Sequence, residues 1–479
     1  MPAISRPLPA ETTEDRGPAP GPRSSGATDR LAAFVVETTL ANIPKDALTL
    51  LRGCFLDFIG NSAFASAKAE SSPPMRSAVR RLDGDGGPAT VIGEARGYSW
   101  QLAALLNGTY AHTLDFDDTN QIQTGHPGAP VIAAALAEAE RLDVNGDSFF
   151  EALAVGYEVC CRVGGAIGPS GYDRGFHITA ISGIFGAVAA VAKLRALNSG
   201  TISNAFGLAL SKASGSMQYL ENGSWNKRIH PGFAAHDALL CTTMAETGVI
   251  GAAAAIEGRY GLLTSFTASP RPEILTDGLG EQWTLLRTAI KPYPSCRLTH
   301  AAIDGALEMR ARFAPNDLRR VKIRVGLSSV EMKIVGERLP EKVAPRNIVD
   351  AQFSIYFQVA AAWLDGKVEW SSYERLGADD IVAMAGRVSA AVDPRVKKAG
   401  ASLVVELDGA EISQTVDYPL GEPERPLGWE KLKEKFLSLA EPVYGAAHAS
   451  RIVESVMNLG ASTRMKAAIG LLRTGGENL

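Results

Sequence analysis

Several long segments of this chain are apolar on nearly every side of the helix that their residue spacing predicts. Ile178 to Leu197 is the most apolar, and Phe149 to Arg162, Thr201 to Leu210 and Ala234 to Gly248 show the same recurrence at three and four residues. A helix that is apolar all round must be buried, and small residues let buried helices approach closely. We therefore expect a multi-layer helical domain and not a two-sided bundle.

A second region alternates apolar and polar residues, as strands with one buried face do. Composition changes near Thr284, and the Asp408-Gly409 step predicts a hairpin turn between two of the alternating segments. Helical spacing from Asp350 to Leu364 and from Ala378 to Val388 lies among these strands. The predicted strands are Val321–Val325, Leu403–Leu407 and Ile412–Val416.

These patterns divide the chain into four parts. Residues 1–30 are rich in Pro, Gly, Ser and Thr and match no targeting signal, so we expect a disordered tail. Residues 31–288 begin a large helical domain, residues 289–420 form a smaller α+β domain, and residues 421–479 return to the first. The predicted fold class is mainly α, with a large all-helical domain and a smaller inserted α+β lid. A site is expected at their junction.

Charge and cysteine content exclude several classes of function. The net charge is −4, with no basic excess to neutralise phosphates, so no nucleic-acid partner is expected. The 5 cysteines show no metal-ligand spacing and are too few for a disulfide-stapled fold, which favours a reducing cytoplasm. The longest apolar stretch, Ile178 to Ala192, is shorter than the ~20 residues that span a bilayer, so no membrane segment is expected.

The segment from Leu114 to Pro130 gathers aspartates, threonines and a histidine between two predicted helices. Buried acidic groups are costly unless they are paired or used. Asp115 lies near the end of the first helix, and His126 lies just before the second, whose N-terminus disfavours a protonated imidazole. His126 is therefore a candidate proton acceptor. The alternative is a polar turn whose side chains only cap the helices.

Three more histidines stand beside glycine or proline, or just before an apolar helix. They are His177, His230 and His300, and two lysines accompany them in apolar, proline-bearing turns, Lys227 and Lys291. Lysine is costly to bury, so we interpret these two as cations that hold substrate carboxylates. The alternatives are histidines that only cap or fill a core, and lysines that extend to the surface.

Other chemistries find less support in the sequence. Asp117-Asp118 resembles the start of a DDxxD magnesium motif, but Gln121 stands where the third carboxylate belongs, and no metal site is expected. Cys296 is a candidate nucleophile without a G-x-S-x-G elbow. No dinucleotide-binding or phosphate-binding glycine pattern occurs. The class of activity that these residues favour is therefore acid–base catalysis on an anionic small molecule.

Abstraction of a proton α to a carboxylate needs a particular set of groups. Cations neutralise the carboxylate, a neutral imidazole takes the proton, and a hydroxyl or second acid protonates the group that leaves. Residues of these types are present as Lys227, Lys291, His126, His177, Asp115 and Thr119.

Six short stretches carry a family resemblance: NGTYAHTLDFDDT, GHPGAPV, GFHITA, GSWNKRIHPGFAAH, GRYG and KPYPSCRLTHAAID. As a set they resemble the MmgE/PrpD family, from about Leu31 to the C-terminus. The family includes 2-methylcitrate dehydratase, cis-aconitate decarboxylase and iminodisuccinate epimerase activities. The resemblance implies a cofactor-free, usually dimeric enzyme with a large helical domain and a smaller lid.

By this resemblance the active-site positions fall on Asp115, Thr119, His126, His177, Lys227 and Lys291, and more weakly on Tyr356. His230 and Cys296 are further candidates for substrate binding. The chain departs from the decarboxylase branch in having Cys296 where that branch has a histidine and HPG in place of HPS, and its Asn120–Gly125 connector is also particular. These departures argue against decarboxylation of cis-aconitate.

Together the residues and the resemblance predict a cytoplasmic, cofactor-independent lyase of the 2-methylcitrate dehydratase type. Its expected substrate is a small di- or tricarboxylate, and its expected assembly is a homodimer. The base is His126 or His177, the carboxylate clamps are Lys227 and Lys291, and Asp115 orients the histidine. The alternatives are an epimerase, a decarboxylase and a non-catalytic carboxylate-binding protein.

Overall fold

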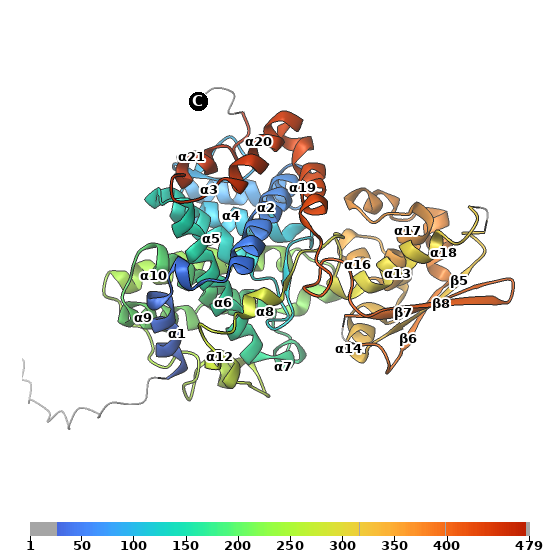
Figure 1. Ribbon diagram of the computed structural model, residues 1–479, viewed down its shortest axis with the longest axis horizontal. Helices are drawn as coiled ribbons and strands as arrows, with labels where there is room; N and C mark the ends of the chain where they lie inside the picture. The colour runs from blue at the N-terminus through green and yellow to red at the C-terminus, as the bar shows by residue number, and fades with distance from the viewer. Residues whose placement is uncertain (1–25, 316, 398, 476–479) are drawn as a thin grey trace, which may run out of the picture.

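The computed structural model describes residues 26–315, 317–397 and 399–475. They form a mainly helical molecule in two bodies (Figure 1). Its buried residues gather in one large cluster and two smaller ones. We call the part around the large cluster, from Ala27 to Ile290 and from Leu427 to Leu472, the larger body. The part around the cluster from Ala301 to Val416 is the smaller body. The predicted mainly α class is confirmed.

The tail prediction lies largely outside the described residues. Its last residues are an exception, because helix α1 (Ala27–Glu37) already begins at Ala27 and buries Thr28 against the larger body. The helical domain therefore starts slightly earlier than the sequence predicts.

The centre of the larger body is built from helices that are buried along most of their length, as predicted. Helix α8 (Ile178–Leu194) packs on α6 (Gly146–Ile167), and α10 (Asn226–Glu246) packs on α4 (Trp100–Thr113). The other long helices around them are α2 (Lys45–Lys68), α3 (Ser72–Asp83), α5 (Gly128–Leu142) and α9 (Ser199–Leu210).

Glycine pairs explain how these helices come so close. A Cβ on Gly186 of α8 would lie 2.6 Å from the carbonyl oxygen of Gly156 on α6. A Cβ on Gly108 of α4 would lie 3.0 Å from the Cα of Gly232 on α10. At both crossings only a residue without a side chain fits, which is the close approach expected from the alanine- and glycine-rich segments.

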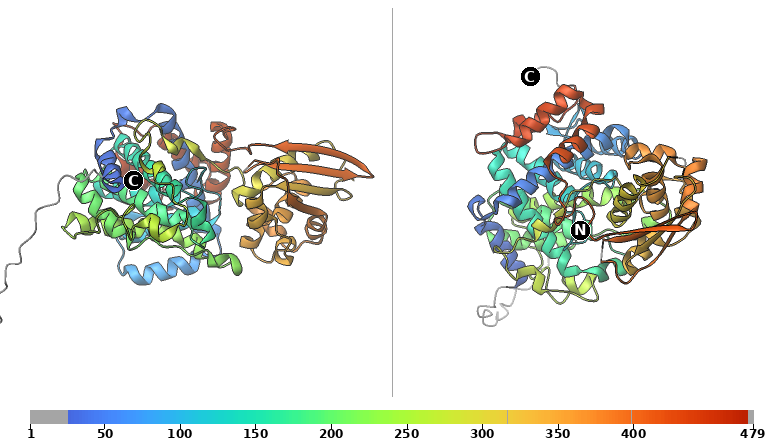
Figure 2. Two further views of the ribbon diagram at one scale, coloured as in Figure 1. Left: turned by 90° about the horizontal axis from the view of Figure 1, so that it is seen from below. Right: turned by 45° about the vertical axis from the view of Figure 1, so that its right-hand side comes forward.

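The smaller body contains a four-stranded sheet in the order β6-β5-β7-β8. Helices α13 (His300–Arg310) and α17 (Ile355–Asp365) cover one of its faces (Figure 2). The predicted hairpin is confirmed, since Asp408 and Gly409 have φ of 52° and 87° between two antiparallel strands. The strands are β5 (Lys322–Leu327), β6 (Val388–Val392), β7 (Ala401–Leu407) and β8 (Ala410–Val416).

Two sequence predictions for the smaller body need correction. The helix expected from Asp350 to Leu364 is divided into α16 (Ile348–Gln352) and α17, because the Ser354 side chain accepts a hydrogen bond from the backbone N–H of Phe357 and caps a new helix. The helix expected to reach Val388 ends at Gly386 as α18 (Asp379–Gly386), and Val388 begins strand β6, parallel to β5.

The C-terminal segment is helical and packs on the larger body. Helix α19 (Trp429–Tyr444) lies against α2, and its Lys435 Nζ forms an ion pair of 2.6 Å with Asp57. Helices α20 (Ala446–Met457) and α21 (Met465–Gly470) follow (Figure 1). The exact domain boundaries after residues 288 and 420, and the role of the smaller body as a lid, stay predictions.

Short elements fix the connections between the two bodies. Strand β3 (Thr119–Asn120) pairs antiparallel with β4 (Thr288–Ala289), which places the acidic segment beside Lys291. Glu422 is buried and pairs with Arg297, and it also accepts a hydrogen bond of 2.6 Å from Gln121. Within the described ranges, no helix is both long and apolar enough to cross a membrane.

Candidate active site

The candidate site lies where the acidic segment turns between α4 and α5. Helix α4 ends at Thr113, and Asp115 follows in the left-handed region with φ of 51°. This turn reverses the chain so that Asp117 comes back beside His112 in the last turn of α4. Helix α5 begins at Gly128, two residues before the predicted proline start, and His126 stands just ahead of it as predicted.

Asp115 joins the two predicted lysines. Its Oδ1 accepts a hydrogen bond from Lys291 Nζ at 2.7 Å and forms an ion pair with Lys227 Nζ at 2.8 Å. Burial by itself raises the pKa of Asp115, but the two ammonium groups hold it well below its usual range. The carboxylate is therefore ionised, and this group of three charges has a net charge of +1. Such a group favours an additional anion.

Lys227 is not in a loop before a helix, as the sequence suggests, but in the first turn of α10. The helix begins at Asn226 and continues through Pro231. Proline removes one helical hydrogen bond, the one its N–H would donate to the carbonyl of Lys227, and this costs least near a helix start. Lys227 and His230 therefore project from the same helix end.

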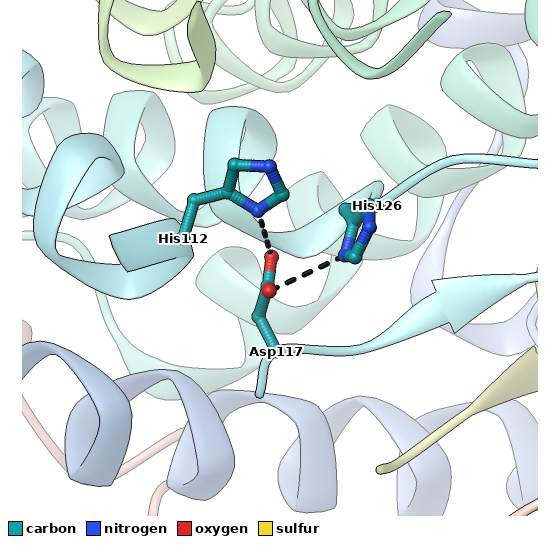
Figure 3. A group of neighbouring side chains, drawn as sticks. All are labelled: His112, Asp117 and His126. Atoms are coloured by element: carbon teal, nitrogen blue, oxygen red, sulfur yellow. Dashed lines mark hydrogen bonds and ion pairs between the residues drawn. The ribbon is translucent and has the colours of Figure 1, made fainter. Parts of the chain in front are cut away.

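Asp117 joins two histidines (Figure 3). His112 Nδ1 lies 2.8 Å from Asp117 Oδ2, and His126 Nδ1 lies 3.3 Å from Asp117 Oδ1. His126 Nε2 in turn lies 3.8 Å from Asp115 Oδ1, the oxygen that both lysines bind. Asp117 and His112 thus connect directly to the predicted base.

A second histidine pair lies beside this group. His177, at the start of α8, and His230, on α10, bring their Nδ1 atoms within 3.1 Å of each other. The His177 ring also stacks on His112, with centroids 5.6 Å apart. The structure therefore brings four histidines together: His112, His126, His177 and His230.

All four imidazoles are neutral near pH 7. Burial lowers the pKa of His112 and of His230 to about 4, and it lowers the pKa of His126 and of His177 as well. Neighbouring cations add to the effect at His126, where Lys291 and Lys227 oppose protonation. A neutral imidazole next to bound cations can accept a proton from a substrate carbon.

Cys296 lies beside the lysine group, and its backbone N–H donates to the Gln352 carbonyl of α16 at 3.0 Å. Burial and the Asp115 charge raise the pKa of its thiol, which keeps the sulfur protonated and unsuited to nucleophilic attack. Residues of the smaller body reach the site here, since the Phe353 ring lies 5.1 Å from Lys227 Nζ. Gln352 also donates to the Leu114 carbonyl at 2.7 Å.

The remaining predicted residues have different positions. Thr119 is buried on β3, and its hydroxyl has no protein partner among the described residues. His300 opens α13, with Nε2 at 3.3 Å from the Ser295 carbonyl. Tyr356 is not brought to the histidine group by any contact between described residues. Its buried hydroxyl donates to the Gly336 carbonyl at 2.6 Å, within the core of the smaller body.

The two adjacent aspartates Asp117 and Asp118, weighed as the start of a magnesium motif, have different partners in the structure. Asp118 points away from the histidines and accepts hydrogen bonds from Tyr157 at 2.9 Å and from the Gly128 N–H at 3.0 Å. Among the described residues, His112, Asp117 and His126 are the one group with the composition and spacing to hold a metal ion, with candidate ligand atoms within 4.8 Å of one another.

Sequence reasoning missed His112 and the role of Asp117. One feature of the sequence could have indicated them: a histidine stands at the end of an apolar helix, five positions before Asp117, in a stretch rich in acidic residues. The pairing depends on the left-handed turn at Asp115, which the sequence does not announce because aspartate adopts this conformation only occasionally.

The fold and the site together define a two-body helical protein with neutral histidines and a lysine-bound aspartate at the junction of the bodies. Residues 29–275 match the MmgE/PrpD N-terminal domain, and residues 293–459 match the MmgE/PrpD C-terminal domain. The chain therefore belongs to the MmgE/PrpD family, which confirms the resemblance drawn from its motifs.

Curated relatives match over most of the chain. The cis-aconitate decarboxylase-like protein oryM of Aspergillus oryzae is 27% identical over 93% of this chain and 97% of its own length. The cis-aconitate decarboxylase of Aspergillus terreus is 26% identical over 94% of this chain and 96% of its own. The human cis-aconitate decarboxylase is 25% identical over 74% of this chain and 76% of its own.

Proposed function

We propose that the protein is a cofactor-independent lyase that acts on a small di- or tricarboxylate by proton transfer at a carbon α to a carboxylate. The observation that carries this proposal is the position of neutral His126, with Nε2 at 3.8 Å from the aspartate oxygen that binds both lysines. A carboxylate drawn to Lys227 and Lys291 would bring its α-carbon close to this nitrogen.

The proposed chemistry assigns one role to each part of the site. The two lysines bind a substrate carboxylate and neutralise charge that develops on it. His126 takes the proton from the α-carbon, and the electron pair of the broken C–H bond forms a double bond as the leaving group departs. We assign His177 and Thr119, whose hydroxyl is buried without a protein partner among the described residues, as candidates to return a proton to the group that leaves.

Two observations bear on the reaction that follows proton transfer. The relatives that match along nearly the whole chain are named cis-aconitate decarboxylases, which favours loss of CO₂ as a second candidate reaction. Cys296, a neutral thiol, occupies the place where the decarboxylase branch is expected to have a histidine, which favours dehydration of a hydroxy acid. Both reactions can use the same lysine clamps. Dehydration needs His126 as the base, whereas loss of CO₂ leaves the electron pair of the broken C–C bond on carbon, where a proton donor must deliver a proton.

Incubation with a panel of citrate-like and succinate-like acids in deuterated water, followed by NMR, tests this proposal. A dehydratase gives loss of water with proton transfer at the α-carbon, and a decarboxylase releases CO₂ and gives a product that carries solvent deuterium on carbon, so the product identifies which of the two. Exchange without elimination would indicate an epimerase. Binding without exchange of any acid would refute proton transfer and leave a carboxylate-binding protein.

The proposal includes a homodimer and a cytoplasmic location. One face of α10 carries Phe233, Leu240 and Met244 with exposed fractions of 50%, 40% and 37%. Their spacing places them on the same side of the helix, and an exposed apolar stripe of this kind is suited to association with a second copy. Light scattering of the wild-type protein and of Phe233→Asp would test this, with a monomeric wild type as the contradicting result.

The buried position of the site suggests why a lid is needed. His126, Lys227 and His230 each expose only 8% of their surface, and Phe353 and Gln352 of the smaller body contact the same region. We propose that the smaller body moves away from the larger body to admit substrate and closes to exclude water during proton transfer.

A further inference from the structure

Asp117 lies between two histidines: one of its oxygens accepts a hydrogen bond from His112, and the other faces His126 at ion-pair distance without hydrogen-bond geometry. His112 Nδ1 lies 2.8 Å from Oδ2, and His126 Nδ1 lies 3.3 Å from Oδ1 (Figure 3). All three side chains are buried. Burial raises the pKa of Asp117, but the two imidazoles facing it hold the pKa well below the usual range, so the carboxylate is ionised.

An ionised carboxylate can only accept hydrogen bonds, and this fixes the protons on both rings. His112 Nδ1 therefore donates its proton to Asp117. At His126 the 3.3 Å contact lacks hydrogen-bond geometry, but an unprotonated Nδ1 there would set its lone pair against a carboxylate oxygen, so the proton belongs on this Nδ1 as well. A neutral imidazole has only one ring proton. Nε2 of His112 and of His126 is therefore unprotonated. At His126 this leaves the basic nitrogen on the side of Asp115 and the lysines, at 3.8 Å from Asp115 Oδ1.

We propose that Asp117 and His112 are positioning residues that set the tautomer and orientation of His126. This proposal rests on the proposed function, in which His126 is the base. Asp117 keeps the proton on Nδ1 of His126, so that Nε2 faces the substrate carbon. His112 occupies the other oxygen of Asp117 and holds the carboxylate in place.

The same contact stabilises the charge that appears during the reaction. When the substrate C–H bond breaks, its proton bonds to His126 Nε2, and its electron pair stays with the substrate. The ring is then an imidazolium with Nδ1–H directed at Asp117. Hydrogen bonds with two charged partners are shorter and stronger than neutral ones, so the 3.3 Å contact tightens at that stage.

His112, Asp117 and His126 have the composition of a metal site, but their geometry favours a proton, and not a metal ion, between the imidazoles and the carboxylate. A separation of 2.8 Å between His112 Nδ1 and Asp117 Oδ2 is the length of a bond with a proton between the two atoms. His126 also has two lysine ammonium groups in its surroundings, which oppose a further cation. Metal binding is therefore the competing outcome of the test.

Nitrogen-15 NMR of the wild-type protein labelled at histidine reads the tautomers without any need for turnover. The inference predicts that His112 and His126, assigned by His112→Gln and His126→Gln, each carry a proton on Nδ1 and none on Nε2. A proton on Nε2 of His126 would overturn it. Elemental analysis of the purified protein is the second test. If the wild type contains one equivalent of a metal and Asp117→Asn contains none, the inference is also overturned.

Steady-state kinetics then test the consequence for the reaction. Asp117→Asn places an amide where a carboxylate oxygen was, so one of the rings must change its tautomer. The turnover number kcat should fall on the order of 10²-fold or more, while KM changes little because the lysine clamp is intact. His112→Gln should lower kcat less. An Asp117→Asn enzyme with wild-type kcat, or with only KM altered, would refute a positioning role.

Asp118→Asn is the matched control, because it makes the same substitution at the next buried residue. Asp118 bonds to Tyr157 and to the Gly128 N–H, away from the histidines. The control should keep kcat within about threefold of the wild type. If no acid in the panel reacts with the wild type, the proposed function fails, while the tautomer assignment from NMR still decides this inference.

Discussion

At the scale of single residues, Asp115 and Asp117 have different kinds of partner in the site. Asp115 pairs with two lysines, and Asp117 pairs with two histidines. The sequence predicted Asp115, His126, His177, Lys227 and Lys291 as one group because each residue type suits carboxylate chemistry, and the structure does bring these residues together. The Asp117–His112 contact was not predictable, since it depends on one left-handed residue.

The lysine clamp gives a prediction about binding. Lys227→Met leaves a substrate carboxylate with one counter-charge fewer in a buried site, so KM should rise on the order of 10-fold or more. Lys212→Met is a suitable control, because Lys212 pairs with Asp237 at the surface of the same body. An unchanged KM for Lys227→Met in steady-state assays would remove Lys227 from the clamp.

The buried histidines give a prediction about pH. His112 and His230 have a pKa of about 4 when folded against 6.5 ordinarily, so the unfolded chain binds more protons between these values and stability falls as pH falls from about 6.5 to about 4. Asp118 and Asp57 act oppositely, because their folded pKa values of about 7 and about 6 add stability that is lost as pH rises. The two contributions oppose each other in the wild type, so the slope of Tm against pH is informative when it is compared with that of a variant.

Asp118→Asn separates the two contributions. It removes one of the groups whose stabilisation declines with rising pH and leaves the histidines in place, so its Tm should climb more steeply between about pH 4 and about pH 7 than that of the wild type. A Tm profile parallel to that of the wild type would contradict a protonated Asp118 in the folded protein.

At the scale of elements, hydrophobic spacing predicted the position of helices that are buried on all sides. It did not predict helix ends or strands that depend on a single proline, a capping side chain or an exposed edge. Helix α8 lies where its pattern predicted. Helix α10 begins before the predicted start because it tolerates Pro231 inside its early turns. Strand β6 was missed because Val388 to Val392 is short and largely exposed, without clear alternation.

The glycine contact between α6 and α8 leads to a prediction about stability. In Gly186→Ala, the new Cβ would lie 2.5 Å from Cys160 Cβ and 2.6 Å from the Gly156 carbonyl oxygen. Overpacking of this kind should lower the free energy of unfolding by about 1–3 kcal/mol or more, as measured by urea denaturation. Gly386→Ala in α18 has open space around the added carbon and should be neutral or slightly stabilising.

At the scale of the whole molecule, the site depends on two bodies that are held together by the segment from Gly421 to Arg425. A linker rich in glycine and proline suggests an exposed and cleavable connection. The structure instead buries Glu422, which pairs with Arg297 and accepts from Gln121, and a bridge joins Glu422 to Arg425. Composition alone does not reveal such long-range partners.

Limited proteolysis tests this attachment. The wild-type protein should resist proteinase K at residues 421–425, because its backbone is held by these contacts. Glu422→Ala leaves Arg297 without its buried partner, and loss of one member of a buried pair costs about 3–5 kcal/mol, so cleavage there should become rapid. Glu430→Ala, on the exposed first turn of α19, should not change the pattern. Rapid cleavage of the wild type would contradict a fixed linker.

The most direct test of the account is the kinetic comparison of His126→Gln with His177→Gln on whichever acid the wild-type protein consumes. A base acts mainly in the transition state, so His126→Gln should lower kcat on the order of 10²-fold or more with little change in KM. His177→Gln should retain more activity. If His126→Gln keeps full turnover while His177→Gln loses it, the base is His177, and full turnover in both variants would contradict acid–base catalysis by these histidines.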